Sequence, residues 1–225
     1  MTYEFVEYDD REVLAIGLAN RLAGDLVAAL GHNERVSFAV PGGTSPGPVF
    51  DDLCAARLDW DRVDVLLTDE RWVPEDHERS NTRLLRERLL VERAANARYL
   101  PLYAPFPEPE GALEALAEPI AANMPLAVVL LGMGADTHTA SLFPGADRLE
   151  EGLSARAPVL LPMRAPGAPE PRITLTAPVL DGALAKHVLI YGAEKRAALE
   201  AARGKPALEA PINAVLSGAT VHWAE

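Results

Sequence analysis

The segment 131–145 carries the side chains best suited to catalysis, in the order Leu-Gly-Met-Gly-Ala-Asp-Thr-His-Thr-Ala-Ser-Leu-Phe-Pro-Gly. Asp136 stands two residues before His138, so its carboxylate can orient the imidazole and stabilise the protonated ring. A histidine held in this way is suited to act as a general base near neutral pH. A lone histidine is more often structural, but this one follows the most apolar stretch of the chain, 126–133, which favours the catalytic interpretation.

Two other segments place binding groups directly after apolar runs. Segment 41–46, Pro-Gly-Gly-Thr-Ser-Pro, has paired glycines whose backbone N–H groups can approach an anion, and a helix should begin after it. A plain turn explains the same residues, so both interpretations stay open. Segment 69–74, Asp-Glu-Arg-Trp-Val-Pro, includes Arg71, which can hold a phosphate or carboxylate through two hydrogen bonds. Ser80 and Asn81 fit the cap of the following helix.

Two more cations stand beside predicted strands near the C-terminus. Arg172 belongs to Pro-Arg-Ile-Thr-Leu-Thr at 171–176, and Lys195 to Gly-Ala-Glu-Lys-Arg at 192–196. A cation at the start of a helix opposes the helix dipole, a local cost that a bound anion would offset. Charge balance by Glu194 is the alternative explanation for Lys195.

The elements that must position these groups are short apolar strands separated by helical patterns. Near-continuous hydrophobicity is typical of parallel strands covered on both faces, and ligands of such sheets bind at the carboxyl ends of the strands. The clear strands are 36–40, 63–68, 126–133 and 187–192; weaker ones are 173–176, 220–223 and an edge strand at 3–8. The pattern predicts an α/β fold, a largely parallel sheet with helices on its faces.

Helices are predicted between these strands over 10–30, 81–93, 112–123 and 194–203. The first has Asp9 or Asp10 as its cap and Gly31 as its stop signal. Segment 158–171 contains five prolines and is predicted to be an irregular surface excursion, since strand and helix patterns resume after it. We therefore expect one domain, 1–225.

Composition excludes several classes of protein. With 21 basic and 33 acidic side chains the net charge is −12, which disfavours nucleic acid and anionic membranes as partners. Cys54 is the only cysteine, so no intrachain disulfide is possible and a cytoplasmic location is expected. The N-terminus lacks the pattern of an export signal, and no later run is expected to reach the length of a membrane span. The five histidines are scattered without the spacing of a metal site.

Taken together, the motifs at 41–46, 69–74 and 131–145 closely resemble the 6-phosphogluconolactonase family. The C-terminal motifs Pro-Arg-Ile-Thr-Leu-Thr, Gly-Ala-Glu-Lys and Pro211-Ile212-Asn213-Ala214-Val215 occur in the order of that family as well. The resemblance runs from about residue 36 to the C-terminus, and its most specific part surrounds His138. It implies the Rossmann-like fold of the glucosamine-6-phosphate deaminases and hydrolysis of a small molecule, 6-phosphoglucono-δ-lactone, in the pentose phosphate pathway without a cofactor.

Transferred residue by residue, the resemblance makes His138 the catalytic base with Asp136 beside it. It implies that the contacts to substrate or phosphate are Gly42, Gly43, Thr44, Arg71, Arg172 and Lys195. Two residues depart from the family pattern: Thr137 stands where glycine is usual, and Pro41 where serine is common. Threonine does not adopt positive φ angles cheaply, so we expect a local difference in the loop.

Two other functions fit parts of the pattern. An aldose–ketose isomerase or amino-sugar deaminase on the same fold needs an acidic residue soon after the histidine, and 139–145 contains none. Asp69 or Glu70 remains able to supply that acid if folding brings it near His138. A non-catalytic sugar-phosphate sensor is the third possibility, although no helix-turn-helix pattern precedes the domain and its acidic charge disfavours DNA.

Overall fold

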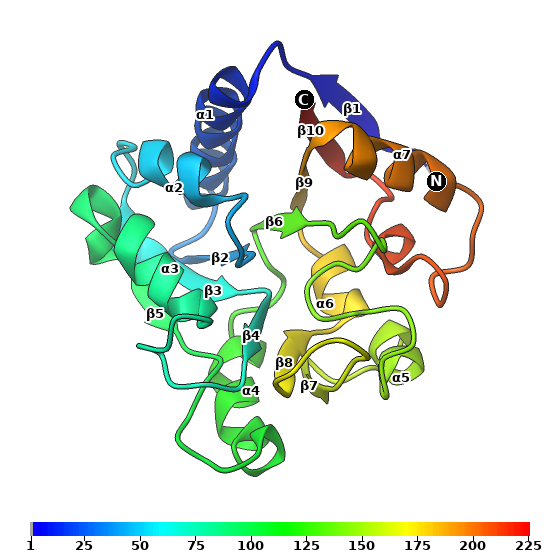
Figure 1. Cartoon of the computed structure of the whole chain (residues 1–225). Coiled ribbons are helices and arrows are strands. Elements are labelled where there is room, and N and C mark those ends of the chain that lie inside the picture. The colour runs from blue at the N-terminus through cyan, green and yellow to red at the C-terminus, as the bar shows by residue number, and fades with distance from the viewer. Residues whose placement is uncertain (1) are drawn as a thin grey trace.

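Seven parallel strands form the main sheet of the computed structural model, which describes residues 2–225. Their order across the sheet is β1-β10-β9-β6-β2-β3-β5 (Figure 1). The bounds are β1 Glu4–Glu7, β2 Val36–Val40, β3 Val63–Leu67, β5 Arg98–Leu100, β6 Val128–Gly132, β9 Ala185–Tyr191 and β10 Thr220–Ala224. Every pairing is parallel, as the apolar runs predicted.

Helices cover both sides of this sheet, so the predicted fold class is confirmed. In Figure 1, α1 and α2 lie on one side and α6 and α7 on the other. The helices are α1 Arg11–Leu30, α2 Gly47–Leu53, α3 Asn81–Arg88, α4 Leu113–Ala121, α5 Leu149–Leu153, α6 Ala177–Asp181 and α7 Gly192–Ala202. Short 3-10 helices span Trp60–Arg62, Glu92–Asn96, Pro109–Gly111 and Pro211–Ala214.

The proline-rich segment 158–171 is not wholly irregular, so that prediction was wrong. Residues Leu160–Met163 form strand β7, which pairs antiparallel with β8 (Arg172–Leu175), and β8 pairs antiparallel with β4 (Asp69–Arg71). All four residues of β7 are buried. Pro162 is tolerated because β7 lies at the edge of this three-stranded sheet, where a missing N–H costs no ladder bond on its outer side.

Helix α1 begins and ends close to the prediction. The Asp10 carboxylate accepts a hydrogen bond from the Val13 N–H at its first turn. The helix has 20 residues, and an 18-residue window of it has a mean hydropathy of 1.6, so by length and composition alone it differs from the expectation that no run reaches a membrane span; the core helix of a soluble protein passes the same test. Seven residues of α1 are buried in the protein core, at the helical spacing of a face packed on protein: Leu14, Ala15, Leu18, Ala19, Leu22, Leu26 and Leu30.

The helix predicted over 81–93 is divided in two. Helix α3 ends at Arg88, and a 3-10 helix follows over Glu92–Asn96. Glu92 adopts φ +49°, a left-handed conformation that no continuous right-handed helix can contain.

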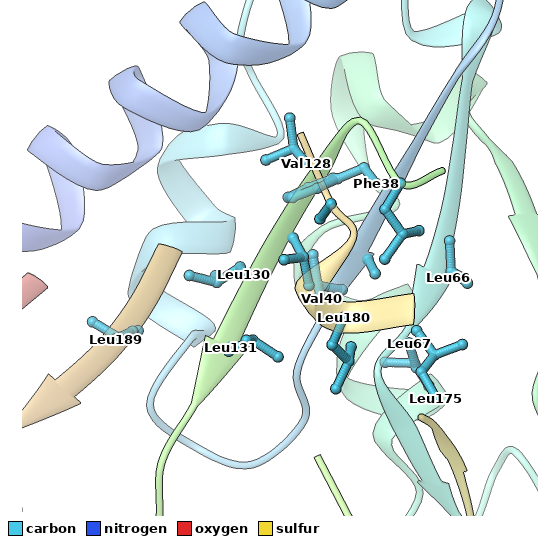
Figure 2. Packing of buried hydrophobic residues seen from close by; sticks show 14 of the residues in the cluster. Phe38, Val40, Leu66, Leu67, Val128, Leu130, Leu131, Leu175, Leu180 and Leu189 are labelled. Carbon is cyan, nitrogen blue, oxygen red and sulfur yellow. The ribbon is translucent and has the colours of Figure 1, made fainter. Parts of the chain in front are cut away.

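The core that holds the site rigid lies along the central strands. Figure 2 shows Phe38 and Val40 of β2 beside Val128 and Leu130 of β6, all fully buried. Leu180 of α6 enters the same cluster. Because such an interior is close-packed, the loops at the carboxyl ends of β2, β3 and β6 start from fixed positions.

Candidate active site

A cavity of about 270 Å³ opens where those loops meet. Its walls include segment 41–46, the end of β6, His138, and three cations, Arg71, Arg172 and Lys195. The structure therefore brings together groups that lie up to 154 residues apart in the chain. Of the eight residues expected at the site, all line this cavity except Asp136, which is connected to it through His138.

His138 and Asp136 form a close pair. The imidazole Nδ1 lies 2.5 Å from Asp136 Oδ1, and the His138 backbone N–H donates to the same oxygen at 3.2 Å. When Nδ1 carries the proton and donates it to the carboxylate, Nε2 keeps a lone pair that can accept a proton. The ring also stacks on Phe143, with centroids 4.1 Å apart. Both contacts restrict how the imidazole can turn.

The loop around this pair is tightly folded. Gly134 N–H donates to His138 O at 3.0 Å, and Thr137 N–H donates to Gly134 O at 2.9 Å. A β-carbon on Gly134 would lie 2.3 Å from the imidazole, so only glycine fits there. Thr137 adopts φ +69°, the conformation that glycine favours, and its buried Oγ1 has no hydrogen-bond partner in residues 2–225. We expected the loop to differ locally because threonine avoids positive φ. Thr137 instead keeps a positive φ, so the backbone here has the conformation that glycine would adopt.

The cations of the cavity are only partly neutralised by protein. Within residues 2–225, Lys195 makes no ion pair or side-chain hydrogen bond, so Glu194 does not balance it by direct contact. Burial holds the pKa of Lys195 below its ordinary value. Arg172 lies 3.6 Å from Asp69 through Nη1, whereas its buried Nε has no partner, and burial lowers its pKa as well. Desolvated, weakly paired cations favour an anionic ligand.

Segment 41–46 forms another part of the cavity wall. Gly43 adopts φ +80°, and Gly42 faces the carboxamide of Asn81, which leaves no room for a β-carbon: one would lie 1.9 Å from Asn81 Cγ. Asn81 therefore lines the cavity, and its Nδ2 donates to the Asp69 carbonyl at 2.9 Å. The N-cap of α3 is Ser80, whose Oγ accepts from Arg83 N–H, whereas Asn81 is the first residue of the helix. The interpretation of Asn81 as a mere cap residue was incomplete.

Asp69 and Glu70 have different surroundings although they are neighbours. Asp69 lines the cavity, where its Oδ2 accepts from Ser141 Oγ at 2.6 Å. Glu70 is fully buried, and its two oxygens accept hydrogen bonds from Arg71 N–H, Ser80 Oγ, Asn81 N–H and both the N–H and the hydroxyl of Thr82. Burial raises the pKa of Glu70. Asp69 is thus the one of the two carboxylates that shares the cavity with His138.

Sequence reasoning missed Asn81 and Ser141 as parts of this neighbourhood. Both are polar and buried. Asn81 lines the cavity, whereas Ser141 is connected to it through the hydrogen bond to Asp69. Both follow strands by several residues, so only the paths of their loops bring them to these positions. Among residues 2–225, no group of three or more His, Cys, Asp or Glu side chains is placed to hold a metal ion.

Comparisons with known proteins agree with this arrangement. A family model described as glucosamine-6-phosphate isomerases/6-phosphogluconolactonase matches residues 9–223. A 6-phosphogluconolactonase from Rhizobium meliloti (strain 1021) is 41% identical, over 96% of this chain and 97% of that protein. One from Mesorhizobium japonicum is 43% identical over 99% and 96%. The crystal structure of a 6-phosphogluconolactonase from Shewanella baltica OS155 superposes with a TM-score of 0.95 at 33% identity, covering 100% and 98%.

Proposed function

The chain belongs to the family of glucosamine-6-phosphate isomerases and 6-phosphogluconolactonases, and we propose that it hydrolyses 6-phospho-D-glucono-1,5-lactone with His138 as general base. Its near full-length relatives are 6-phosphogluconolactonases, hydrolases that act on a sugar lactone, and the chain belongs to that class of enzyme. One observation carries the residue assignment: the His138–Asp136 pair and three weakly paired cations border a single cavity.

The proposed reaction is acyl transfer to water. His138 Nε2 removes a proton from water while the water oxygen attacks C1 of the lactone, and Asp136 stabilises the imidazolium that forms. Backbone N–H groups or a cation at the cavity hold the oxyanion of the tetrahedral intermediate. The C1–O5 bond then breaks, and the proton on His138 passes to O5. The products are the opened sugar hydroxyl and a carboxylic acid, which ionises in water.

The phosphate is proposed to bind at the cationic wall of the cavity. Lys195, Arg71 and Arg172 supply positive charge, and the lack of an ion pair to Lys195 among the described residues supports a role in anion binding. Gly42, Gly43 and Thr44 supply backbone donors or a hydroxyl to the substrate. In this arrangement phosphate binding orients the lactone carbonyl toward His138.

The composition supports a small-molecule substrate in the cytoplasm. A net charge of −12 disfavours nucleic acid and anionic membranes as partners, whereas the cavity concentrates positive charge locally. Cys54 is buried and unpaired, which suits a reducing compartment. Asp69 lines the cavity and could serve as the acid that the deaminase alternative requires. This carboxylate, however, already accepts a hydrogen bond from Ser141. The near full-length relatives, moreover, are lactonases.

The test is hydrolysis of 6-phosphoglucono-δ-lactone by the purified chain, measured as acid release above the spontaneous rate. His138→Ala should lower kcat by about 10²- to 10⁴-fold, the usual loss for a general base, with the circular dichroism spectrum unchanged. A kcat within a few-fold of wild type would remove His138 from the mechanism. Glucosamine-6-phosphate serves as the second substrate, and ammonia release at a comparable rate would assign the chain to the deaminases instead.

A further inference from the structure

The segment Pro211–Ala214 has no part in the proposed chemistry, although it contacts two elements that carry it. It is a 3-10 helix whose first three residues are buried, and Asn213 is only 5% exposed. A buried carboxamide must find hydrogen-bond partners, because leaving it unpaired costs stability. The Asn213 carboxamide connects this segment to helix α7, and the backbone N–H of Ile212 connects it to the loop of His138.

The first connection is to the end of helix α7. Asn213 Nδ2 donates to Ala202 O at 2.7 Å and to Lys205 O at 2.9 Å. Ala202 is the last residue of α7, and its carbonyl also accepts from Lys205 N–H at 3.1 Å, so Asn213 Nδ2 is its second donor. Gly204, between the two acceptors, has φ +78°, so Asn213 fixes both the helix end and the turn that follows. Lys195 lies in the same helix, about 10 Å away along its axis.

The second connection is to the loop of the histidine. Ile212 N–H donates to Thr137 O at 3.0 Å. Thr137 stands between Asp136 and His138 and has φ +69°, a strained conformation for threonine. Such a residue keeps this conformation only where its surroundings impose it, and the bond from Ile212 is one of the contacts that do so. Ile212 and Asn213 are adjacent residues of one buried turn, so the two connections share a rigid backbone.

We infer that Asn213 is a positioning residue, which holds the helix of Lys195 and the loop of His138 in a fixed relation through the 3-10 helix Pro211–Ala214. The inference rests on the proposed function, because it assumes that Lys195 binds phosphate and His138 activates water. Removing the carboxamide leaves Ala202 O with the Lys205 N–H alone and takes the Asn213 donor from Lys205 O, which loosens the end of α7 and the turn that presents Ile212 to Thr137. We therefore expect weaker binding of the substrate and a slower chemical step, because small displacements of catalytic groups reduce rates strongly.

The test compares Asn213→Ala with Ser37→Ala, well below the unfolding temperature of either. Ser37 is a matched control: it is 2% exposed and its Oγ donates to a backbone carbonyl, that of Asn123, at the opposite end of β2 from segment 41–46. For Asn213→Ala we expect about a threefold to tenfold rise in KM for the phosphorylated lactone and a similar fall in kcat. For Ser37→Ala we expect a lower Tm with both constants unchanged.

A second readout reports the loop without catalysis. The Gly134 and Thr137 amides donate within the His138 loop, so their hydrogen exchange measures how often it opens. Asn213→Ala should speed their exchange by about fivefold or more, and Ser37→Ala should not. If Asn213→Ala does not fold, Asn213→Ser, which keeps one donor, should give the same changes to a smaller degree.

The outcomes separate the inference from the proposed function. If Lys195→Ala and His138→Ala impair activity as expected but Asn213→Ala changes only Tm, as Ser37→Ala does, the positioning role is overturned alone. If Lys195→Ala leaves KM for the phosphorylated lactone unchanged, the phosphate assignment fails first. If the Asn213 variants shift KM, kcat and loop exchange together, the positioning role is supported.

Discussion

Replacement of Thr137 by glycine should stabilise the protein, although it lies beside the proposed catalytic base. A threonine at φ +69° is strained by about 1–2 kcal/mol, and its buried, unpartnered hydroxyl costs about 1–3 kcal/mol. Against this, glycine loses about 0.5–1 kcal/mol more chain entropy on folding, and one buried methyl group worth about 0.8 kcal/mol is removed. The balance favours glycine by about 0.2–3.7 kcal/mol, with a midpoint near 2 kcal/mol. For a domain of this size, about 2 kcal/mol raises Tm by about 4–8 °C.

The assay is urea unfolding and thermal melting of Thr137→Gly, Thr137→Ala and wild type. Thr137→Ala removes the hydroxyl but keeps a β-carbon at positive φ, so the glycine variant should exceed it by about 1 kcal/mol. Thr176→Gly is the matched control, because Thr176 is fully buried with φ −89° and its hydroxyl donates to Pro158 O. That variant should lose stability.

Activity completes this test. The backbone bonds of residue 137 to Gly134 and Ile212 need no side chain, so kcat of Thr137→Gly should stay within about threefold of wild type. A Thr137→Gly variant no more stable than Thr137→Ala would show that the positive φ stores no strain, and the reasoning from backbone conformation would be refuted.

Three further predictions concern Lys195, His222 and the removal of metal ions. Lys195→Ala should raise KM for the phosphorylated lactone by about tenfold or more, because a charge-assisted contact of roughly 1.5–3 kcal/mol is lost. KM for unphosphorylated gluconolactone should change much less. An equal rise in KM for both substrates would show that Lys195 does not bind the phosphate. His222 is hydrogen-bonded to Tyr8 and His187, and burial lowers its pKa to about 3. Since an unfolded histidine titrates near 6.5, the unfolded state binds more protons between pH 6.5 and 3. The free energy of unfolding should therefore fall by up to about 1.4 kcal/mol per pH unit as pH drops through that window, and His222→Gln should flatten the slope in urea titrations. Lactonase activity should survive exhaustive chelation, because the proposed path uses only side-chain proton transfer and fixed charge; metal-dependent recovery of activity would contradict it.

The main elements of the fold were predictable because their signals are local. Strand β2 has the predicted bounds, 36–40, since a run covered on both faces by helices is apolar throughout. The cap at Asp10 was predictable for a similar reason: the carboxylate binds an N–H three residues away. The pairing of Asp136 with His138 also belongs to this group, because two residues of separation bring the side chains within reach in a tight turn.

Other features depend on residues far apart in the sequence, and only the tertiary structure decided them. Pro162 lies in a strand because its neighbour β8 leaves it at an edge, which no local pattern records. Asn81 lines the cavity because Gly42 leaves room for its carboxamide. The family resemblance identified Thr137 as an unusual residue, yet its positive φ is supported by a hydrogen bond from Ile212, 75 residues later. Local propensity disfavours that conformation, and a long-range contact in a packed interior overrides it.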